Sequence, residues 1–88
     1  MKVEFKNSFA RDIKNVKDKG LLKFVKDVIK SVENAGSLSE IQNLKKLKGG
    51  GNFYRLRVGD FRIGISFKND IVIFVRFLYR KDIYKRFP

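Results

Sequence analysis

The sequence predicts a small α+β domain, with an antiparallel sheet, helices packed on one sheet face, and the order β-α-α-βββ-α. Two observations support this fold class. Apolar residues recur every three or four positions through residues 9–44, which is the spacing of helices that bury one side. After the glycines at 49–51, apolar and polar residues alternate, which is the spacing of strands. With 88 residues, we expect one domain over positions 1–88.

The N-terminal elements follow from alternation and capping residues. Val3 and Phe5 alternate with charged residues and predict a short first strand. Asn7 or Ser8 can cap the helix that follows, because their side-chain oxygens accept hydrogen bonds from free backbone N–H groups. We expect Gly20 to end this first helix.

A second helix is expected over residues 21–35, where one apolar stripe continues along the helical period. Gly36 follows it, in the place where a helix C-cap favours a residue with positive φ. Residues 37–44 predict a third, short helical stretch, because their apolar side chains also fall on one face. The side chains of all three stripes are interpreted as core.

The C-terminal half predicts an antiparallel meander with a last short helix. Its three strands are expected over residues 53–58, 61–68 and 71–79, and its helix over residues 81–86. Gly59-Asp60 and Lys68-Asn69-Asp70 supply the turns. The third strand is apolar on both faces except at Arg76, which is typical of a central strand.

The chain is strongly basic, and the charge is unevenly distributed. Twenty-one Lys and Arg against nine Asp and Glu give a net charge of +12, and six of the seven arginines lie in residues 45–88. A guanidinium can grip two phosphate oxygens at once, so this half favours a polyanionic partner. Charge alone leaves an acidic protein open as the alternative. The lack of Cys and His excludes disulfides, thiolate chemistry and the usual zinc sites, and we expect no metal or cofactor.

A two-residue turn at Gly59-Asp60 would place Arg57 directly opposite Arg62, with Arg55 two residues along on the same face. Like charges that face each other across a strand pair are unfavourable. A fold tolerates such a pair when an anion lies between them. The strand pattern therefore predicts an anion site on this face.

Arg76 belongs to the same face if residues 68–70 form a three-residue loop, because Arg62 and Arg76 are then paired. With a two-residue loop, its side chain points the other way. We expect the shared face, because an arginine buried without a partner is costly.

Further RNA contacts are expected on both sides of the meander. Arg80 and Tyr84 are four residues apart near the start of the last helix, which suits stacking on a base while its phosphate is held. Before the meander lies a lysine cluster, and the glycines after it predict a hinge rather than a phosphate loop, since no Gly-Lys-Ser/Thr follows. The cluster consists of Lys45, Lys46 and Lys48.

Two stretches resemble the RelE/ParE superfamily of type II toxins, and its RelE branch in particular. LKG at 47–49 and FYRLRVGDFRI at 53–63 are similar to the family's L-x-G and Y-R-I-R-V-G-D-Y-R-I. YRKDIY at 79–84 is similar to its terminal H-R-x-D-I-Y. Length and element order also agree, so the resemblance covers essentially the whole chain. It implies the RelE-like microbial ribonuclease fold.

The resemblance implies an mRNA interferase, an endoribonuclease that enters the ribosomal A site and makes a 2′-hydroxyl attack the adjacent phosphate. By this comparison, Arg62 and Arg80 stabilise the charge that develops on the scissile phosphate. Tyr84 stacks on the substrate or transfers a proton to it. Arg55 and Arg57 stand where the best-known member has lysines for acid/base and phosphate contacts.

The chain departs from the family pattern in two respects. Arginine at 55 and 57 cannot readily act as a base, and Tyr79 replaces a histidine found in many relatives. The proton carrier therefore stays open among Tyr84, Tyr79 and a lysine of 45–48. Two other functions also stay open: a ParE-like toxin acting on DNA gyrase, and a basic RNA-binding protein without activity. The expected RNA-binding residues are Arg55, Arg57, Arg76, Tyr79, Lys45, Lys46 and Lys48.

The resemblance also implies partners, namely a small acidic antitoxin of the RelB type, the ribosome and mRNA. No membrane partner is expected, because no apolar signal region opens the chain and the longest apolar run, residues 71–75, is far too short to span a bilayer. We therefore expect a cytoplasmic protein.

Overall fold

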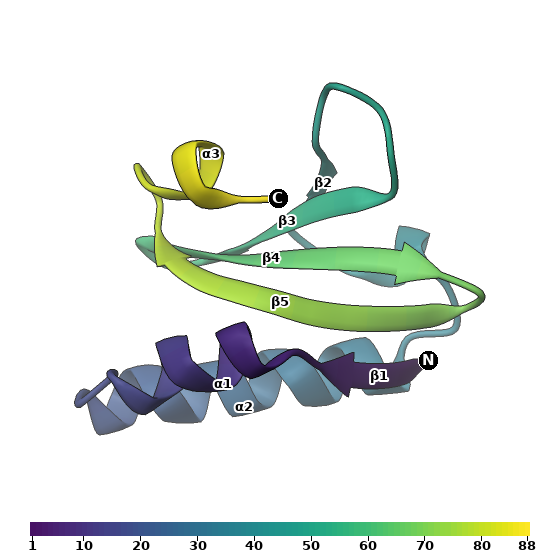
Figure 1. The fold of residues 1–88 in the computed structure, drawn as a ribbon. Helices are drawn as coiled ribbons and strands as arrows, with labels where there is room; N and C mark the ends of the chain where they lie inside the picture. Colours follow the sequence, from purple (N-terminus) through teal and green to yellow (C-terminus); the bar gives the residue numbers. More distant parts are fainter.

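The computed structural model describes all 88 residues and contains one five-stranded sheet (Figure 1). The strands are β1 (Lys2–Phe5), β2 (Leu44–Lys46), β3 (Phe53–Val58), β4 (Phe61–Lys68) and β5 (Ile71–Tyr79). They lie in the order β1-β5-β4-β3-β2, so β1 and β2 are the two edges. The sheet is mixed, because β1 runs parallel to β5 while the other neighbours are antiparallel.

The helices lie on both sides of this sheet. They are α1 (Asn7–Lys14), α2 (Lys19–Asn34), the 3-10 helix η1 (Leu38–Glu40) and α3 (Ile83–Arg86). Figure 1 shows α1 and α2 beneath the sheet and α3 above it. The expected α+β class is confirmed, and the meander of β3, β4 and β5 has the predicted bounds. The expectation of an antiparallel sheet with helices on one face is wrong, because β1 is parallel to β5 and α3 covers the second face. No helix combines the length and the apolar character needed to cross a membrane.

The main core lies between the sheet and the two long helices. Side chains from α1, α2 and the three meander strands form one cluster of ten buried residues. The cluster contains Phe9, Val25, Val32, Leu56, Val58, Ile63, Ile65, Val72, Phe74 and Phe77. This burial fixes which face of each strand points toward α1 and α2, and the alternate residues of β3 and β4 therefore point to the other face.

A second, smaller core holds α3 against that other face. It consists of Leu78, Ile83 and Phe87, with Leu47, Phe53 and Val75 packed around them. A helix of four residues cannot be stable by itself, so this apolar contact keeps α3 in place. The side of the sheet that carries the exposed strand residues is therefore partly covered.

Two expected helix ends are wrong. Gly20 does not end the first helix but lies inside α2, because the Asp18 side chain caps that helix by accepting a hydrogen bond from the Leu21 N–H at 3.1 Å. Gly36 is not a positive-φ cap either. The chain leaves α2 through extended backbone at Ala35, with φ −71° and ψ 142°.

The expected third helical stretch over residues 37–44 is also wrong beyond one short turn. Only η1 is helical, and Leu44 begins the edge strand β2. Asn43, with φ 64°, redirects the backbone, and Lys45 then pairs with Arg55 of β3. Pairing with β3 thus overrides a helical apolar spacing that covers only a few residues.

Candidate nucleic-acid interface

Arg57 and Arg62 face each other across β3 and β4, as the sequence predicted. The turn that sets this register contains only Gly59 and Asp60, and Gly59 has the positive φ of 58° that such a turn requires. Arg55 lies two residues along β3, opposite Gly64. All three arginines point away from the main core, because Leu56 and Val58 between and beside them are buried in it.

The backbone of Arg80 lies beside the turn that pairs Arg57 with Arg62. Its N–H donates a hydrogen bond to the carbonyl of Asp60 at 2.9 Å, which fixes the end of β5 against the turn between β3 and β4. Partial burial lowers the pKa of Arg62, and the charges of Arg55, Arg57 and Arg80 lower it further. The guanidinium groups of Arg55, Arg57 and Arg80 are therefore near that of Arg62, and we call these four arginines the arginine cluster.

The Arg62 guanidinium is held in a fixed position at the turn. Its Nη1 donates to the carbonyl oxygens of Gly59 at 2.9 Å and Phe61 at 2.8 Å. Its Nε and Nη2 make no hydrogen bond within the chain, so both can donate to an anion. Arg62 thus has the geometry of a phosphate ligand whose position is set before the ligand arrives.

The cluster is not neutralised internally. The single ion pair of the protein joins Arg76 and Asp12, away from these four groups. Arg55 even keeps its Nε buried without a hydrogen-bond partner. A buried donor without a partner is costly, so this cluster is suited to a ligand that supplies the missing acceptors.

Tyr84 projects from α3 beside the cluster. Its side chain is 64% exposed, and the Arg55 Cζ atom lies 5.9 Å from the centre of its ring. The sequence predicted Arg80 as its neighbour on one helix. Instead, α3 begins at Ile83, so Arg80 lies in the turn before the helix, and the cation at the ring is Arg55.

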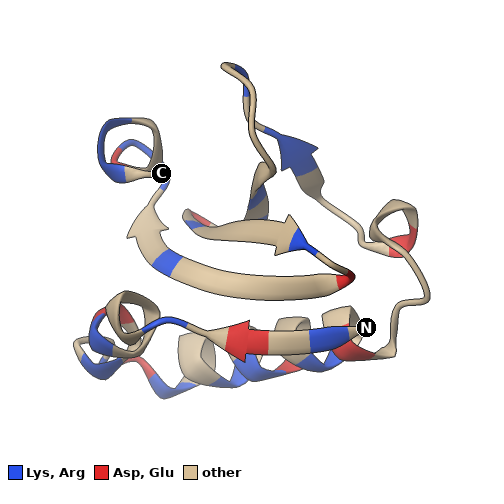
Figure 2. Cartoon of the chain, turned by 45° about the vertical axis from the view of Figure 1, so that its right-hand side comes forward, with Lys and Arg blue, Asp and Glu red and all other residues tan.

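A groove of about 470 Å³ continues from Tyr84 toward β2. Its lining residues are Lys45, Lys46, Leu47, Lys48, Arg55, Tyr84, Phe87 and Pro88. We call it the basic groove, because four of these residues are cations and none is acidic. The predicted lysine cluster thus lies at the sheet edge, where β2 carries its first two lysines, and the glycines at 49–51 follow with positive φ. Figure 2 shows Lys and Arg in blue along the edge strand β2 and along α3.

The expected three-residue loop and the pairing of Arg76 with Arg62 are wrong, because Arg62 is paired with Leu78. The turn after β4 has two residues, Asn69 and Asp70, but a bulge between Gly64 and Ile65 shifts the register of β5 and places Arg76 opposite Gly64, on the face of Arg55. The Arg76 guanidinium is nevertheless not part of the arginine cluster, because it turns to the edge of β5. Arg76 meets Asp12 of α1, with Nε to Oδ2 at 2.7 Å and Nη2 to Oδ1 at 3.1 Å. This hydrogen bond with Asp12 raises the pKa of Arg76. Arg76 is therefore not a buried arginine without a partner, because Asp12, which is distant in the sequence, accepts its hydrogen bonds.

Tyr79 also lies apart from the arginine cluster. It is paired with Phe61 across β4 and β5, and the two rings meet edge to face with centres 5.6 Å apart. Phe61 packs against the main core, so the Tyr79 ring is on the α1 and α2 side. The structure therefore brings together Arg55, Arg57, Arg62, Arg80, Tyr84 and the lysine cluster, but not Arg76 or Tyr79.

Two residues that support this surface were missed in the sequence. Gly64 lies beneath the ring of Phe87, and a Cβ at Gly64 would come within 2.7 Å of that ring. The seat of α3 therefore depends on a glycine in β4. A glycine inside a strand is a recognised sign of close approach, and this signal was available in the sequence.

The chain matches a known protein family over nearly its whole length. Residues 3–84 match the family described as the ParE toxin of type II toxin–antitoxin system, parDE. The chain is 44% identical over 89 residues to Toxin RelE3 of Methanocaldococcus jannaschii, with 100% of both chains covered. It is 30% identical to Putative toxin RelE1 of the same organism, over 91% of this chain and 89% of the relative.

Solved structures give the same relationship. A chain of the RelB–RelE antitoxin–toxin complex from Methanococcus jannaschii matches with a TM-score of 0.80 and 41% identity, over 97% of this chain and 99% of that one. The archaeal RelE–RelB complex from Pyrococcus horikoshii contains a chain that matches with a TM-score of 0.73 and 19% identity, over 90% and 93% of the two chains. This second likeness supports the fold alone.

Proposed function

Because the chain belongs to the RelE/ParE superfamily of type II toxins, we propose that it is a ribosome-dependent endoribonuclease that cleaves mRNA in the ribosomal A site. The observation that carries this proposal is the arginine cluster beside Tyr84. Four guanidinium groups without internal counter-charges lie together on one face, and Arg62 has two free donor atoms there. This arrangement suits a phosphate that gains negative charge during a reaction.

In the proposed reaction, the 2′-oxygen of one ribose attacks the neighbouring phosphorus while the bond to the 5′-oxygen of the next nucleotide breaks. The products are a 2′,3′-cyclic phosphate and a free 5′-hydroxyl. Arg62 and Arg80 stabilise the five-coordinate phosphorus, since they reach it from different elements. The leaving 5′-oxygen needs a proton, and the phenol of Tyr84, whose ring centre lies 5.9 Å from the Arg55 Cζ atom, would supply it. The 2′-hydroxyl proton passes to water, because the guanidinium groups of the cluster stay protonated and cannot accept it.

The basic groove supports the same proposal by extending the cationic surface. Its lysines would contact phosphates next to the cleaved bond, and lysine contacts are tolerant of sequence because each is a point charge. A second role follows for the net charge of +12, which would speed the approach to the RNA-rich ribosome.

We further propose that a small acidic antitoxin binds the chain and covers the arginine cluster. Solved relatives are described as RelB–RelE antitoxin–toxin complexes, and the charge of this chain favours an acidic partner. Release of that antitoxin would uncover the site.

The test is expression of the chain under a tight promoter, with transcript ends mapped, and cleavage of mRNA on purified programmed ribosomes. We expect growth arrest, cuts in the A-site codon and no cleavage of free mRNA. Arg62→Ala and Arg80→Ala should each lower the cleavage rate by about a hundred- to a thousandfold, as for other groups that stabilise developing charge. Lysine at either position should restore only part of the rate, because the bidentate fork is lost. DNA breaks with intact transcripts would instead assign the chain to gyrase, and an active Arg62→Ala, Arg80→Ala double variant would overturn the site.

A further inference from the structure

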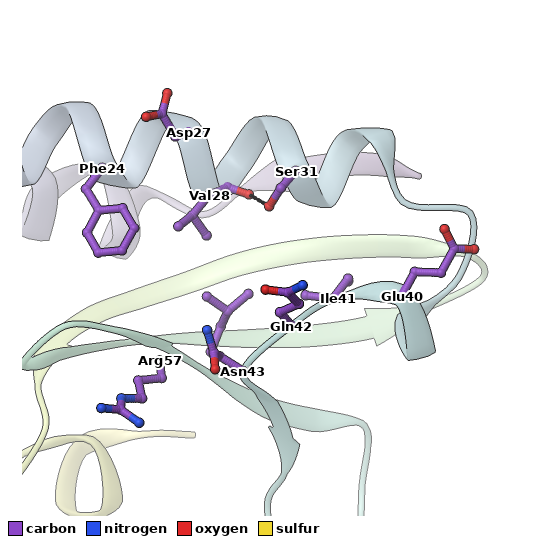
Figure 3. A pocket seen from close by; sticks show the side chains of 10 residues that line it. Phe24, Asp27, Val28, Ser31, Glu40, Ile41, Gln42, Asn43 and Arg57 are labelled. Atoms are coloured by element: carbon purple, nitrogen blue, oxygen red, sulfur yellow. Dashed lines mark hydrogen bonds between the residues drawn. The ribbon is translucent and has the colours of Figure 1, made fainter.

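The arginine cluster borders on two grooves. Arg55 lines the basic groove, and Arg57 lines a second groove of about 420 Å³ between α2 and the chain that leads into β2 (Figure 3). We call this second one the α2 groove. None of Arg62, Arg80 and Tyr84 lines it, so the proposed reaction leaves the α2 groove without a role.

One wall of the α2 groove carries an exposed aromatic ring. Phe24 is 47% exposed, whereas seven of the other eight phenylalanines are buried or half-buried. Figure 3 shows Phe24 and Val28 pointing from α2 toward residues 41–43. Leu56, a residue of the main core, also lines the groove. The groove therefore offers a flat apolar surface on which a second flat group can stack.

The segment that faces α2 across the groove supplies polar groups. Gln42 and Asn43 line the groove, and their exposed side-chain amides make no hydrogen bond within the chain. The backbone of Asn43 is fixed to β3, because its carbonyl accepts a hydrogen bond from the Arg57 N–H at 3.1 Å. Each amide has both a donor and an acceptor, as the edge of a nucleobase requires of its protein partners.

The charges of the α2 groove are separated. Arg57 lies at one end and Glu40 at the other, while Asp27 points from α2 away from the sheet (Figure 3). Arg57 is the only cation that lines the groove, and it also belongs to the arginine cluster. Phosphates are therefore attracted to the Arg57 end alone, and the rest of the groove suits an uncharged group.

We propose that the α2 groove binds one unpaired nucleobase of the RNA, an inference that rests on the proposed function. The base stacks on Phe24, its edge meets the amides of Gln42 and Asn43, and its phosphate lies at Arg57. Single-stranded RNA is commonly held in this way, with bases stacked on aromatic rings and phosphates on cations. One fixed base would set the position of the strand along the arginine cluster.

The lining of the groove distinguishes a base from two other occupants. An acidic protein segment is disfavoured, because the carboxylates of Asp27 and Glu40 lie beside the groove. A second copy of the chain is disfavoured, because two proteins that each carry +12 repel. A base carries no charge, and it satisfies both the exposed ring and the free amides.

The experiment measures dissociation constants for short single-stranded RNAs by fluorescence anisotropy at low salt. Every ribose of the RNA carries a 2′-O-methyl group, so that it cannot be cleaved, and one base at a time is removed to leave an abasic site. All chains carry Arg62→Ala, so that cells tolerate them. At one position, loss of the base should raise the dissociation constant by about five- to a hundredfold. The same loss should have no effect on Phe24→Ala, because its stacking ring is already absent.

A second variant and two matched controls complete the test. Asn43→Gly removes an amide but keeps the backbone, since Asn43 has a φ of 64° that glycine adopts freely. It should also weaken binding of the intact RNA. Asn69→Gly, with a φ of 54° in the turn after β4, should leave the affinity unchanged. So should Phe5→Ala, because Phe5 is 50% exposed on β1 at the other sheet edge.

Asn43→Gly keeps the test valid if Phe24→Ala fails to fold. Equal effects of Phe24→Ala on intact and abasic RNAs would overturn the proposal, as would an unchanged affinity of folded Asn43→Gly. A wild-type dimer that Phe24→Ala dissociates, with RNA affinity unchanged, would assign the groove to a second copy instead. Because this RNA cannot be cleaved, normal ribosomal cleavage without base-dependent binding refutes the base site alone. Base-dependent binding without any ribosomal cleavage supports the base site and refutes the proposed ribonuclease activity.

Discussion

The ring of Phe87 lies directly over Gly64, and an added Cβ at Gly64 would come within 2.7 Å of the ring carbon Cγ. Phe87 also meets Phe53 edge to face, with ring centres 5.7 Å apart. These contacts seat α3 on β4, at the position opposite Arg55. The distance between Tyr84 and Arg55 therefore depends on Gly64, which is paired with Arg55 across the two strands and has no side chain to push Phe87 away.

Gly64→Ala should displace Phe87 and shift α3 together with Tyr84. We expect the free energy of unfolding to fall by about 1–3 kcal/mol, as is usual when a packed core is overfilled, and the cleavage rate of the folded protein to fall as well. Val32→Ala is the control, because Val32 is fully buried in the main core on the other side of the sheet. It should lower stability without changing the rate per folded molecule, as measured by urea denaturation and ribosomal cleavage. Equal cleavage by both variants would contradict a positioning role for α3.

Asp12→Asn should destabilise the fold and spare catalysis. The Asp12 carboxylate accepts hydrogen bonds from Arg76 and, at 2.9 Å, from the backbone N–H of Phe77. Both partners lie at the β5 bulge, where the regular pairing is interrupted. Loss of the carboxylate should cost about 1–3 kcal/mol in the free energy of unfolding, because a mostly buried donor is left without its acceptor.

The matched control for Asp12→Asn is Asp27→Asn, because Asp27 is exposed and makes no ion pair. Its unfolding midpoint should equal that of the unchanged protein. Cleavage by folded Asp12→Asn should be normal, because Arg76 is not part of the arginine cluster. A selective loss of cleavage would return Arg76 to the RNA-binding residues.

Replacing Lys45, Lys46 and Lys48 with glutamine should weaken ribosome binding and flatten its salt dependence. Each phosphate contact that is lost lowers the slope of log K against log salt concentration by about one. Stability should change by about half a kcal/mol or less, because these side chains are exposed and β2 pairs through its backbone. A large drop in melting temperature would show instead that the lysines support the sheet edge.

The meander could be predicted from the sequence because its signals are local. Alternation fixed the buried faces of β3 and β4, and a turn of two residues left only one register. Arg57 and Arg62 could therefore be placed opposite each other without a structure. The same local logic identified Arg55 and the lysines as neighbours of the site.

Features that depend on distant contacts could not be predicted in this way. The β5 bulge redirects Arg76, and its partner Asp12 lies 64 positions earlier in the chain. The edge strand β2 has only three residues and forms because β3 offers an unpaired edge. Such short elements carry too few residues for a periodic signal.

Tyr84 provides the sharpest test of the proposed chemistry. Tyr84→Phe keeps the ring 5.9 Å from the Arg55 Cζ atom and removes only the hydroxyl. If the phenol protonates the leaving 5′-oxygen, single-turnover cleavage on programmed ribosomes should slow by about a hundred- to ten-thousandfold. Tyr84→Ala is the comparison, since it removes the ring as well and should also weaken binding. Full activity of Tyr84→Phe with a slow Tyr84→Ala would confine Tyr84 to stacking, and the proton would then have to come from a lysine of the basic groove or from the ribosome.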